Sequence, residues 1–333
     1  MTPGVLTPGV LTPGVKTPGM MPDMIYTVTL NPALDLELTV AAIELDCVLR
    51  ASTTQVDAGG KGFNVSRALA ALGVPSIALG FVGGRTGEHL KARLEQLGIS
   101  TDFVHVSGET RTNLSVVTEP ASHYLKVNQA GPTIQPEEQD AMVGKVRQRA
   151  RAGEAWIFSG NLPPGIPADI YAQLIALVRS SGGKAILDTS GHALHLGARA
   201  GPFLVKPNAL EASQLTGHEV GNPSQARQAA AKMHAWGIAL VLISLGSAGA
   251  VLSDGRQAWW GQPPRIAERN PIGAGDAALA GCVYALEQGA PAAEALRWSV
   301  ACGAAAASLP GTAVGDRALV EALSAQVKIE HLG

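Results

Sequence analysis

Short apolar segments alternate with longer segments of helical periodicity along most of this chain. The short segments are bounded by glycine, proline or asparagine, as buried strands are, and lie at residues 24–30, 76–81, 155–158, 185–187, 203–205 and 240–244. Apolar residues recur every three or four positions at residues 64–72, 88–97, 168–179, 223–236, 274–288 and 292–309. This alternation predicts an α/β fold, with a mainly parallel sheet covered by helices on both faces.

Two stretches interrupt the alternation. Residues 35–57 and 103–128 alternate apolar and polar side chains, with no helical segment inside either stretch. Such a pattern is typical of an antiparallel sheet with one face exposed. We therefore predict a small antiparallel sheet that stands off the main domain as a lid.

The chain opens with four near-identical five-residue units, MTPGV, LTPGV, LTPGV and KTPGM. Pro-Gly pairs mark turns, and a segment with so little apolar mass cannot offset the entropy lost on ordering it. We interpret residues 1–23 as a low-complexity tail outside the fold and residues 24–333 as one domain that carries the lid.

Composition excludes several functional classes. The chain has 25 lysine and arginine residues against 27 aspartate and glutamate residues, whereas a nucleic-acid-binding protein normally has a basic excess. The longest apolar run, residues 238–252, is too short to cross a bilayer. Its three cysteines lie far apart and cannot form a disulfide framework, which favours a reducing compartment. We expect a cytoplasmic protein that binds neither nucleic acid nor membrane.

The sharpest motif is Asn270-Pro-Ile-Gly-Ala-Gly-Asp276, which leads directly into a predicted helix. Gly273 and Gly275 free the backbone at the helix start, where unpaired N–H groups and the helix dipole favour an anion. A carboxylate at Asp276 beside such a site suits a base that takes a proton from an attacking hydroxyl during phosphoryl transfer. The alternative is a helix-capping aspartate behind a glycine turn.

A second glycine-rich turn, Ala58-Gly-Gly-Lys-Gly62, precedes the helix that contains Asn64. The chain has neither G-x-x-x-x-G-K-[ST] nor G-x-G-x-x-G, so the common nucleotide-binding fingerprints are absent. Lys61 could pair with a phosphate or with sugar hydroxyls. The alternative is an ordinary strand-to-helix turn with an exposed lysine.

Polar residues also follow two later predicted strands. Lys206-Pro-Asn-Ala-Leu-Glu211 places Glu211 one turn into a helix, where a carboxylate suits Mg²⁺ and its waters. Asn208 and Glu211 have the spacing of a capping box equally well. Residues 244–249 form either a nucleotide rim or a tight hairpin. Arg111, in the predicted lid, suits a phosphate, or it is an ordinary strand arginine.

In their order along the chain these motifs resemble the ribokinase-like phosphofructokinase-B family of sugar kinases. The matching segments are residues 27–35, 58–64, 80–87, 108–111, 159–165, 206–208 and 270–276. The resemblance extends from residue 24 to the C-terminus. It implies a three-layer α/β/α domain with a small β-sheet lid.

The activity implied by this resemblance is ATP- and Mg²⁺-dependent phosphorylation of a ketohexose phosphate. Fructose 1-phosphate, giving fructose 1,6-bisphosphate, is the first candidate, on the finer matches at residues 24–32, 130–134 and 202–208. Tagatose 6-phosphate and fructose 6-phosphate are alternatives, because their kinases share much of the pattern. A catalytically silent sensor of nucleotide or sugar phosphate and a nucleoside or ribose kinase are the other candidates.

The resemblance also implies roles for matched residues. Asp276 would be the catalytic base, and the anion hole would consist of Gly273, Ala274 and Gly275. The sugar phosphate would be bound by Asp35, Gly59, Gly60, Lys61, Asn64, Arg111 and Asn161, with Lys61 and Arg111 facing the existing phosphate. ATP would be bordered by Lys206, Asn208, Ser244, Gly246 and Gly249. Glu211 would hold Mg²⁺ through water, and the small sheet would serve as lid and as the surface of a homodimer.

Two residues depart from the family pattern. The family commonly has serine where this chain has Asn161, whose amide can still donate a hydrogen bond to a sugar. The residue after the catalytic aspartate is usually serine, and here it is Ala277. This change lowers the polarity of the helix start and removes no essential group.

Overall fold

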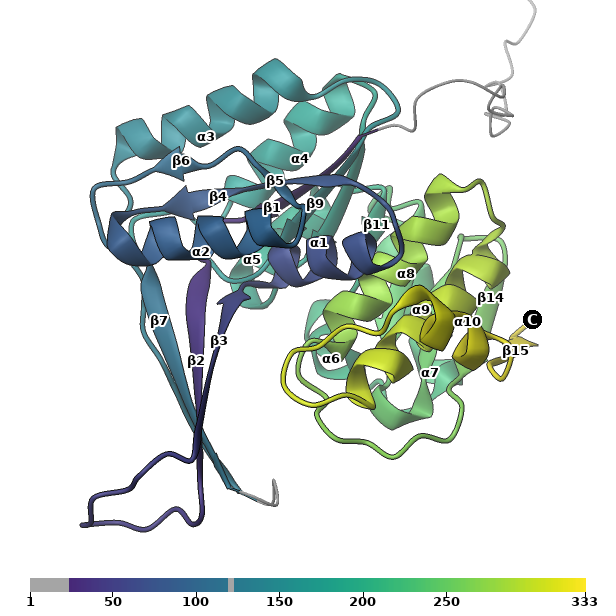
Figure 1. Cartoon of the computed structure of the whole chain (residues 1–333). Helices are drawn as coiled ribbons and strands as arrows, with labels where there is room; N and C mark the ends of the chain where they lie inside the picture. Colours follow the sequence, from purple (N-terminus) through teal and green to yellow (C-terminus); the bar gives the residue numbers. More distant parts are fainter. Residues whose placement is uncertain (1–23, 119–122) are drawn as a thin grey trace, which may run out of the picture.

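The computed structural model describes residues 24–118 and 123–333, so the predicted tail at residues 1–23 lies outside the described residues. Within the described ranges the chain forms a body built on one large sheet and a smaller sheet that projects from it (Figure 1). None of the described helices has the length and apolar character needed to cross a membrane.

The large sheet is mainly parallel, as predicted. Its described strands have the order β15-β14-β13-β12-β11-β10-β9-β1-β4-β5, and β6 also pairs with β4. The parallel strands are β1 (Ile25–Thr29), β4 (Ser76–Val82), β5 (Ser100–Thr101), β6 (Val104–His105), β9 (Ala155–Ser159), β10 (Lys184–Asp188), β11 (Leu204–Val205) and β12 (Leu240–Ser244). The antiparallel edge consists of β13 (Ala250–Ser253), β14 (Ala258–Gln262) and β15 (Lys328–His331).

Helices cover both faces of this sheet, because its strands are apolar on both faces. In β1, for example, Tyr26 and Val28 pack in one core cluster and Ile25 packs in the other. The first cluster includes residues of α3 (Pro136–Arg149), α4 (Ile170–Ser180), α5 (Gly191–Arg199), α6 (Ala209–Thr216) and α7 (Pro223–His234). The opposite face is covered by α1 (Lys61–Ala71), α2 (Gly84–Gln96), α8 (Ala274–Glu287), α9 (Ala292–Ala307) and α10 (Arg317–Ser324).

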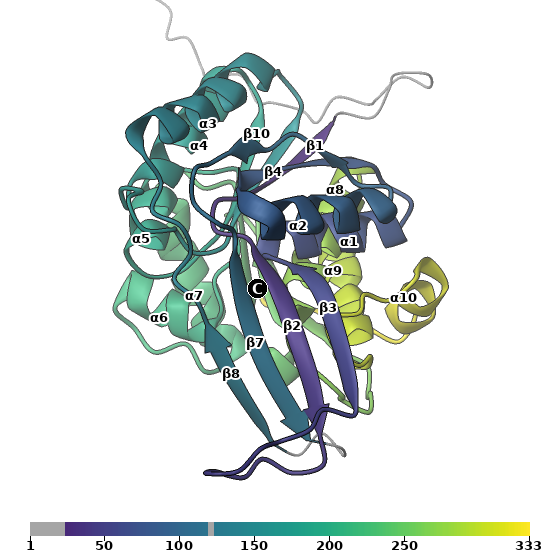
Figure 2. The same ribbon diagram turned by 60° about the vertical axis from the view of Figure 1, so that its left-hand side comes forward.

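The small sheet has four strands in the order β3-β2-β7-β8 (Figure 2). They are β2 (Ala33–Val40), β3 (Thr53–Gly59), β7 (Arg111–Thr118) and β8 (Tyr124–Asn128). The two outer pairs are antiparallel, but β2 and β7 in the middle are parallel, so the prediction of an antiparallel sheet was wrong for this pair. Both strands leave the body in the same direction, and this makes them parallel (Figure 2).

The second predicted lid stretch began too early. Phe103 and Val104 are buried in the body, and β6 pairs with β4 of the large sheet. The projecting part of that stretch therefore starts at Arg111, the first residue of β7.

Candidate active site

A cleft of about 470 Å³ lies where the carboxyl ends of the parallel strands meet the small sheet. Residues at the ends of β1 and β12, or directly after β9, β10 and β11, line it because all of these strands end at the same edge. The starts of α1 and α8 and the polar face of the lid complete its wall. A cleft of this size is within the usual range for a small-molecule site.

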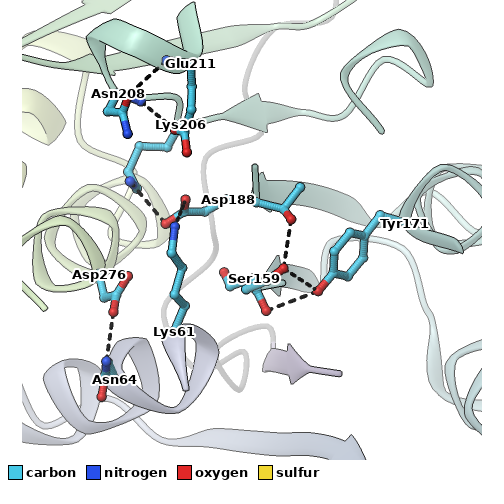
Figure 3. Close-up of polar contacts among 11 residues, drawn as sticks. Lys61, Asn64, Ser159, Tyr171, Asp188, Lys206, Asn208, Glu211 and Asp276 are labelled. Carbon is cyan, nitrogen blue, oxygen red and sulfur yellow. Dashed lines mark hydrogen bonds and ion pairs between the residues drawn. The ribbon is translucent and has the colours of Figure 1, made fainter. Parts of the chain in front are cut away.

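Asp276 lies in the first turn of α8 and points into the cleft, although only 7% of its surface is exposed (Figure 3). Gly273 precedes the helix with a φ of 82°, a left-handed conformation that favours glycine. Asn64 of α1 donates from Nδ2 to Oδ2 of Asp276 at 2.8 Å. The helix start and α1 thus hold one carboxylate at the edge of the cleft.

The predicted anion hole is only partly open. The N–H of Ala274 donates to the main-chain oxygen of Pro271 at 3.2 Å. In contrast, the N–H groups of Gly273 and Gly275 have no acceptor within the described ranges, and both residues line the cleft. Two free amides, those of Gly273 and Gly275, therefore face the cleft, and the amide of Ala274 is already bonded.

Asp188, which our sequence analysis missed, joins two of the predicted cationic residues. It ends β10, is fully buried, and forms ion pairs with Lys61 at 3.0 Å and Lys206 at 3.1 Å (Figure 3). Burial alone would raise the pKa of Asp188, but the two ammonium groups outweigh burial and hold this pKa below its usual value. Two cations on one anion leave a net positive charge, which suits a phosphate ligand.

The pKa of Asp276 is shifted in the opposite direction from that of Asp188. Burial raises the pKa of Asp276 to about 6, and the negative charge of Asp188 acts in the same direction. The charges of Lys61 and Lys206 and the hydrogen bond from Asn64 lower it and only partly compensate. A carboxylate with a raised pKa is a stronger base, as general-base catalysis near neutral pH requires.

The acid limb of the pH–rate profile tests this environment. We expect kcat/KM to fall about tenfold per pH unit below about pH 6, because a protonated Asp276 cannot accept a proton. Profiles are measured with wild type and with Asp140→Asn, a change of an exposed aspartate on α3. A phosphate group on a substrate would titrate in the same range, so its pKa is measured separately by ³¹P NMR. A midpoint near pH 4, the value of an ordinary aspartate, would contradict the prediction.

Arg111 lines the cleft, but its guanidinium is already engaged. It donates to the main-chain oxygens of Gln129 and Asn31, each at 2.9 Å, and more weakly to that of Pro32 and to Oδ1 of Asn161. These bonds fasten the first residue of β7 to the segments that follow β1, β8 and β9. Arg111 therefore shapes the base of the lid, and its charge remains at the edge of the cleft.

The face of the lid that borders the cleft is polar. Asp35 of β2 accepts a hydrogen bond from Nδ2 of Asn113 on β7 at 2.7 Å. Burial raises the pKa of Asp35, and the bond from Asn113 and the charges of Lys126 and Arg111 oppose this rise. A Cβ atom at Gly59 would lie 2.2 Å from Oδ2 of Asp35, so glycine there leaves room for this carboxylate.

Asn208 and Glu211 form the capping box that our sequence analysis left open as an alternative. The side chain of Asn208 accepts from the N–H of Glu211 at 2.9 Å, and Oε2 of Glu211 accepts from the N–H of Asn208 at 2.9 Å (Figure 3). The second oxygen of Glu211 has no hydrogen-bond partner in the described parts of the chain, and the residue lines the cleft. A free carboxylate oxygen fits Mg²⁺, which binds oxygen ligands and retains water.

Most of the residues predicted from sequence line one cleft. These are Asp35, Gly60, Lys61, Asn64, Arg111, Asn161, Lys206, Asn208, Glu211, Ser244, Gly273, Gly275 and Asp276. Four predicted residues do not line it, namely Gly59, Ala274, Gly246 and Gly249. Segment 244–249 is a tight connection between the antiparallel strands β12 and β13, and Ser244 at its start lines the cleft, so the nucleotide-rim alternative stays a prediction.

Several lining residues were missed, among them Thr29, Asn31, Asn113, Lys126, Asn128, Thr189 and Thr312. Thr29, Asn31 and Thr189 could have been found, because they end or follow predicted strands at the carboxyl edge. The sequence predicted the lid strands that contain Asn113, Lys126 and Asn128. It did not predict how these strands pair, and the pairing directs these side chains to the cleft.

Taken together, the layered fold, the lid and the carboxylate beside free amides define an enzyme that transfers a phosphoryl group to a hydroxyl. A sequence model described as pfkB family carbohydrate kinase matches residues 29–318. The chain therefore belongs to the pfkB family of carbohydrate kinases, which use ATP as phosphoryl donor, and the predicted family is confirmed.

Named relatives agree with this membership. The 1-phosphofructokinase of Xanthomonas campestris is 38% identical over 78% of this chain and 83% of its own length. The tagatose-6-phosphate kinase of Staphylococcus epidermidis is 34% identical over 79% of this chain and 85% of its own length.

Solved structures confirm the ribokinase-like fold. Escherichia coli phosphofructokinase-2, in a complex with potassium, superposes with a TM-score of 0.87 at 31% identity, covering 91% of this chain and 99% of that one. Arabidopsis thaliana ribokinase superposes with a TM-score of 0.71 at 23% identity, covering 91% and 99%, and shares the fold.

Proposed function

We propose that this protein phosphorylates a ketohexose phosphate, with fructose 1-phosphate as substrate and fructose 1,6-bisphosphate as product. The observation that carries the proposal is the position of Asp276 in the cleft beside the free amides of Gly273 and Gly275. The pair of lysines on Asp188 supports an anionic substrate. Relatives named 1-phosphofructokinase, 33–38% identical to this chain, support the choice of sugar.

In the proposed reaction, Asp276 accepts the proton of the sugar's 6-hydroxyl as its oxygen attacks the γ-phosphorus of ATP. A P–O bond to the sugar forms, the bond between the γ-phosphorus and ADP breaks, and the proton stays on Asp276. The amides of Gly273 and Gly275 stabilise the negative charge on the transferred group. Lys61 and Lys206 add positive charge nearby, because the ammonium of Lys206 lies 3.5 Å from the Cβ position of Gly275.

ATP binding is assigned to the side of the cleft formed by Lys206, Asn208 and Ser244. Glu211, on the same side, would hold Mg²⁺ through water, and the bound ion supplies positive charge to the nucleotide's phosphates. Because ATP and sugar phosphates occur together in the cytoplasm, the predicted location is consistent with this role and stays a prediction.

A substrate panel tests the proposal. We expect kcat/KM for fructose 1-phosphate to exceed that for fructose 6-phosphate and tagatose 6-phosphate by tenfold or more, about 1.4 kcal/mol of transition-state discrimination. ADP release is measured by a coupled assay, with ribose and adenosine as uncharged controls. A preference for either 6-phosphate would overturn the choice of sugar, and tight binding without ADP release would indicate a sensor.

The lid has a second, apolar face, which we propose joins two copies of the chain. Because side chains alternate along strands, Leu36, Leu114 and Val127 lie on the face opposite Asp35 and Asn113. Leu125 and Val127 of β8 are each 52% exposed. A sheet face with so many apolar side chains is typical of an interface.

Oligomeric state tests this surface. We expect the wild type to be a dimer and Leu36→Asp a monomer by size-exclusion chromatography with light scattering, because two charges would be buried at the interface. Leu97→Asp, a change of a 53% exposed leucine on the body, should leave the dimer intact. A monomeric wild type, or a dimer that persists in Leu36→Asp, would contradict the proposal.

A further inference from the structure

The amide of Asn64 has two orientations of similar shape and opposite polarity. In the one observed, Nδ2 donates to Oδ2 of Asp276 at 2.8 Å. Turned by 180°, the amide would place its oxygen against the carboxylate, which is repulsive when Asp276 is ionised. The orientation of this amide therefore decides whether Asp276 is stabilised in its charged, basic form.

Arg67 lies one turn further along α1 and binds the other end of this amide. Its Nη1 donates to Oδ1 of Asn64 at 3.4 Å and to Oγ1 of Thr312 at 3.1 Å. A guanidinium can only donate hydrogen bonds. Arg67 is therefore compatible only with the orientation of Asn64 that directs Oδ1 at Arg67 and Nδ2 at Asp276.

The partly buried guanidinium of Arg67 lowers the stability of the fold. It is partly buried and forms no ion pair among the residues that the structure describes. Burial lowers the pKa of Arg67, and the carboxylates of Asp57 and Asp35 only partly oppose this. A half-buried cation without an ion pair is destabilising, so a purely structural role would be served as well by an apolar side chain.

Thr312 connects Arg67 to the lid. Its hydroxyl donates to Oδ2 of Asp57 at 3.2 Å, and Asp57 on β3 is the direct cross-strand partner of Asp35. The loop that contains Thr312 is in turn held by Nδ2 of Asn270, which donates to the main-chain oxygen of Gly311 at 2.8 Å. Hydrogen bonds thus run without interruption from the lid strand to Asp276.

We propose that Arg67 is a positioning residue, which fixes the amide of Asn64 toward Asp276 and is itself held by Thr312 and Asp57 of the lid. The inference rests on the proposed function, because it assigns a role toward the base of that reaction. The charged groups that face Asp276 directly are Asp188, Lys61 and Lys206, and Arg67 reaches it only through Asn64.

Direct titration of the Asp276 carboxyl tests the proposal. Its pKa is measured by ¹³C NMR of protein labelled at aspartate, and Asp276→Asn identifies the resonance. We expect Asn64→Ala to raise this pKa by roughly one unit and Arg67→Met by about half a unit or more, because a hydrogen bond to the charged form is lost or misaligned. Arg147→Met, on the exposed face of α3, is the control and should leave it unchanged.

The double variant, Arg67→Met combined with Asn64→Ala, separates positioning by Arg67 from a direct effect of its charge on Asp276. If Arg67 acts through Asn64, Arg67→Met adds less than about 0.2 units in the Asn64→Ala background. The same shift in both backgrounds, or no shift in either, would overturn the proposal. Thr312→Val, in the loop between α9 and α10, is a further variant, and we expect a smaller upward shift that also disappears in Asn64→Ala.

Kinetics then distinguish this inference from the proposed function. We expect the acid limb of kcat/KM to move to higher pH by the same amount as the carboxyl pKa in each variant. If the carboxyl shifts as expected and the acid limb does not follow, Asp276 is not the base and the proposed reaction fails. If the acid limb follows Asp276 in Asn64→Ala and does not move in Arg67→Met, the reaction stands and the role of Arg67 fails.

Discussion

We expect Asp276→Asn to lower kcat by about 10²–10⁴-fold, with KM for both substrates changed little. An amide matches the carboxylate in shape but cannot accept the proton of the attacking hydroxyl, and general-base contributions have this magnitude. Steady-state rates with fructose 1-phosphate and ATP measure the effect, and Asp140→Asn on the exposed face of α3 is the control. A turnover within tenfold of wild type would contradict the assigned base.

The thermal stability of Asp276→Asn distinguishes a loss of catalysis from a loss of folding. Because the pKa of Asp276 is raised in the native state, the folded protein binds this proton more tightly than the unfolded chain does. Ionised Asp276 therefore lowers the free energy of unfolding at neutral pH, and the loss is complete only above about pH 6. We expect Tm of Asp276→Asn at pH 7 to be no lower than that of wild type, so that lost turnover is not explained by unfolding.

The second large effect is expected for Asp188→Asn, with the opposite sign on stability. Asp188 has a lowered pKa, so its ionised form stabilises the fold at neutral pH. Its removal leaves Lys206, whose side chain is 6% exposed, without a counterion, whereas Lys61 at 40% can still be hydrated. Breaking a buried pair costs about 3–5 kcal/mol, and we expect the lower part of this range by chemical denaturation.

Two further measurements make this prediction specific. The charge of Asp188 raises the pKa of Asp276, so its loss should move the acid limb of kcat/KM to lower pH. Lys206→Met added to Asp188→Asn should recover part of the lost stability, because it removes the unpaired cation. Unchanged stability in the single variant would show that these lysines are hydrated and not held by Asp188.

The body of the fold could be predicted from sequence because its signals are local. Strands such as β9 and β12 are short apolar runs between turn residues, and the predicted segments overlap them closely. Helices α3, α5 and α10 were missed. In α3 the charged residues outnumber the apolar ones, and its start is marked by the capping box of Gln135 and Glu138.

The lid shows where local signals fail. Alternation identified its strands, but alternation does not specify the partner of a strand. The parallel pair of β2 and β7 joins residues 78 apart, as in the register of Ala33 with Arg111, and depends on where the body releases each strand. For the same reason Phe103 was assigned to the lid, although it packs beside Phe63 in the body.

The site was predictable as a set of residues and not as a network. Glycine motifs and strand ends identified Lys61, Lys206 and Asp276, but the ion pair between Lys61 and Asp188 spans 127 positions. No spacing rule connects such residues, so the sequence could not show that both lysines share one counterion. Asp188 directly follows a predicted buried strand, and this position at the carboxyl edge was the available signal.

The division of the small sheet into two strand pairs has a consequence for the order of folding. Strands β2 and β3 leave the body before α1, whereas β7 and β8 leave it more than fifty residues later in the chain, as the bounds of β3 and β7 show. A two-stranded pair is at best marginally stable alone, so we expect the body to form first and to bring β2 beside β7. Backbone amides of these four strands should therefore exchange with solvent sooner than those of β1 or β9. If the small sheet forms last, the protein completes its core before the wall that this sheet gives to the cleft is in place.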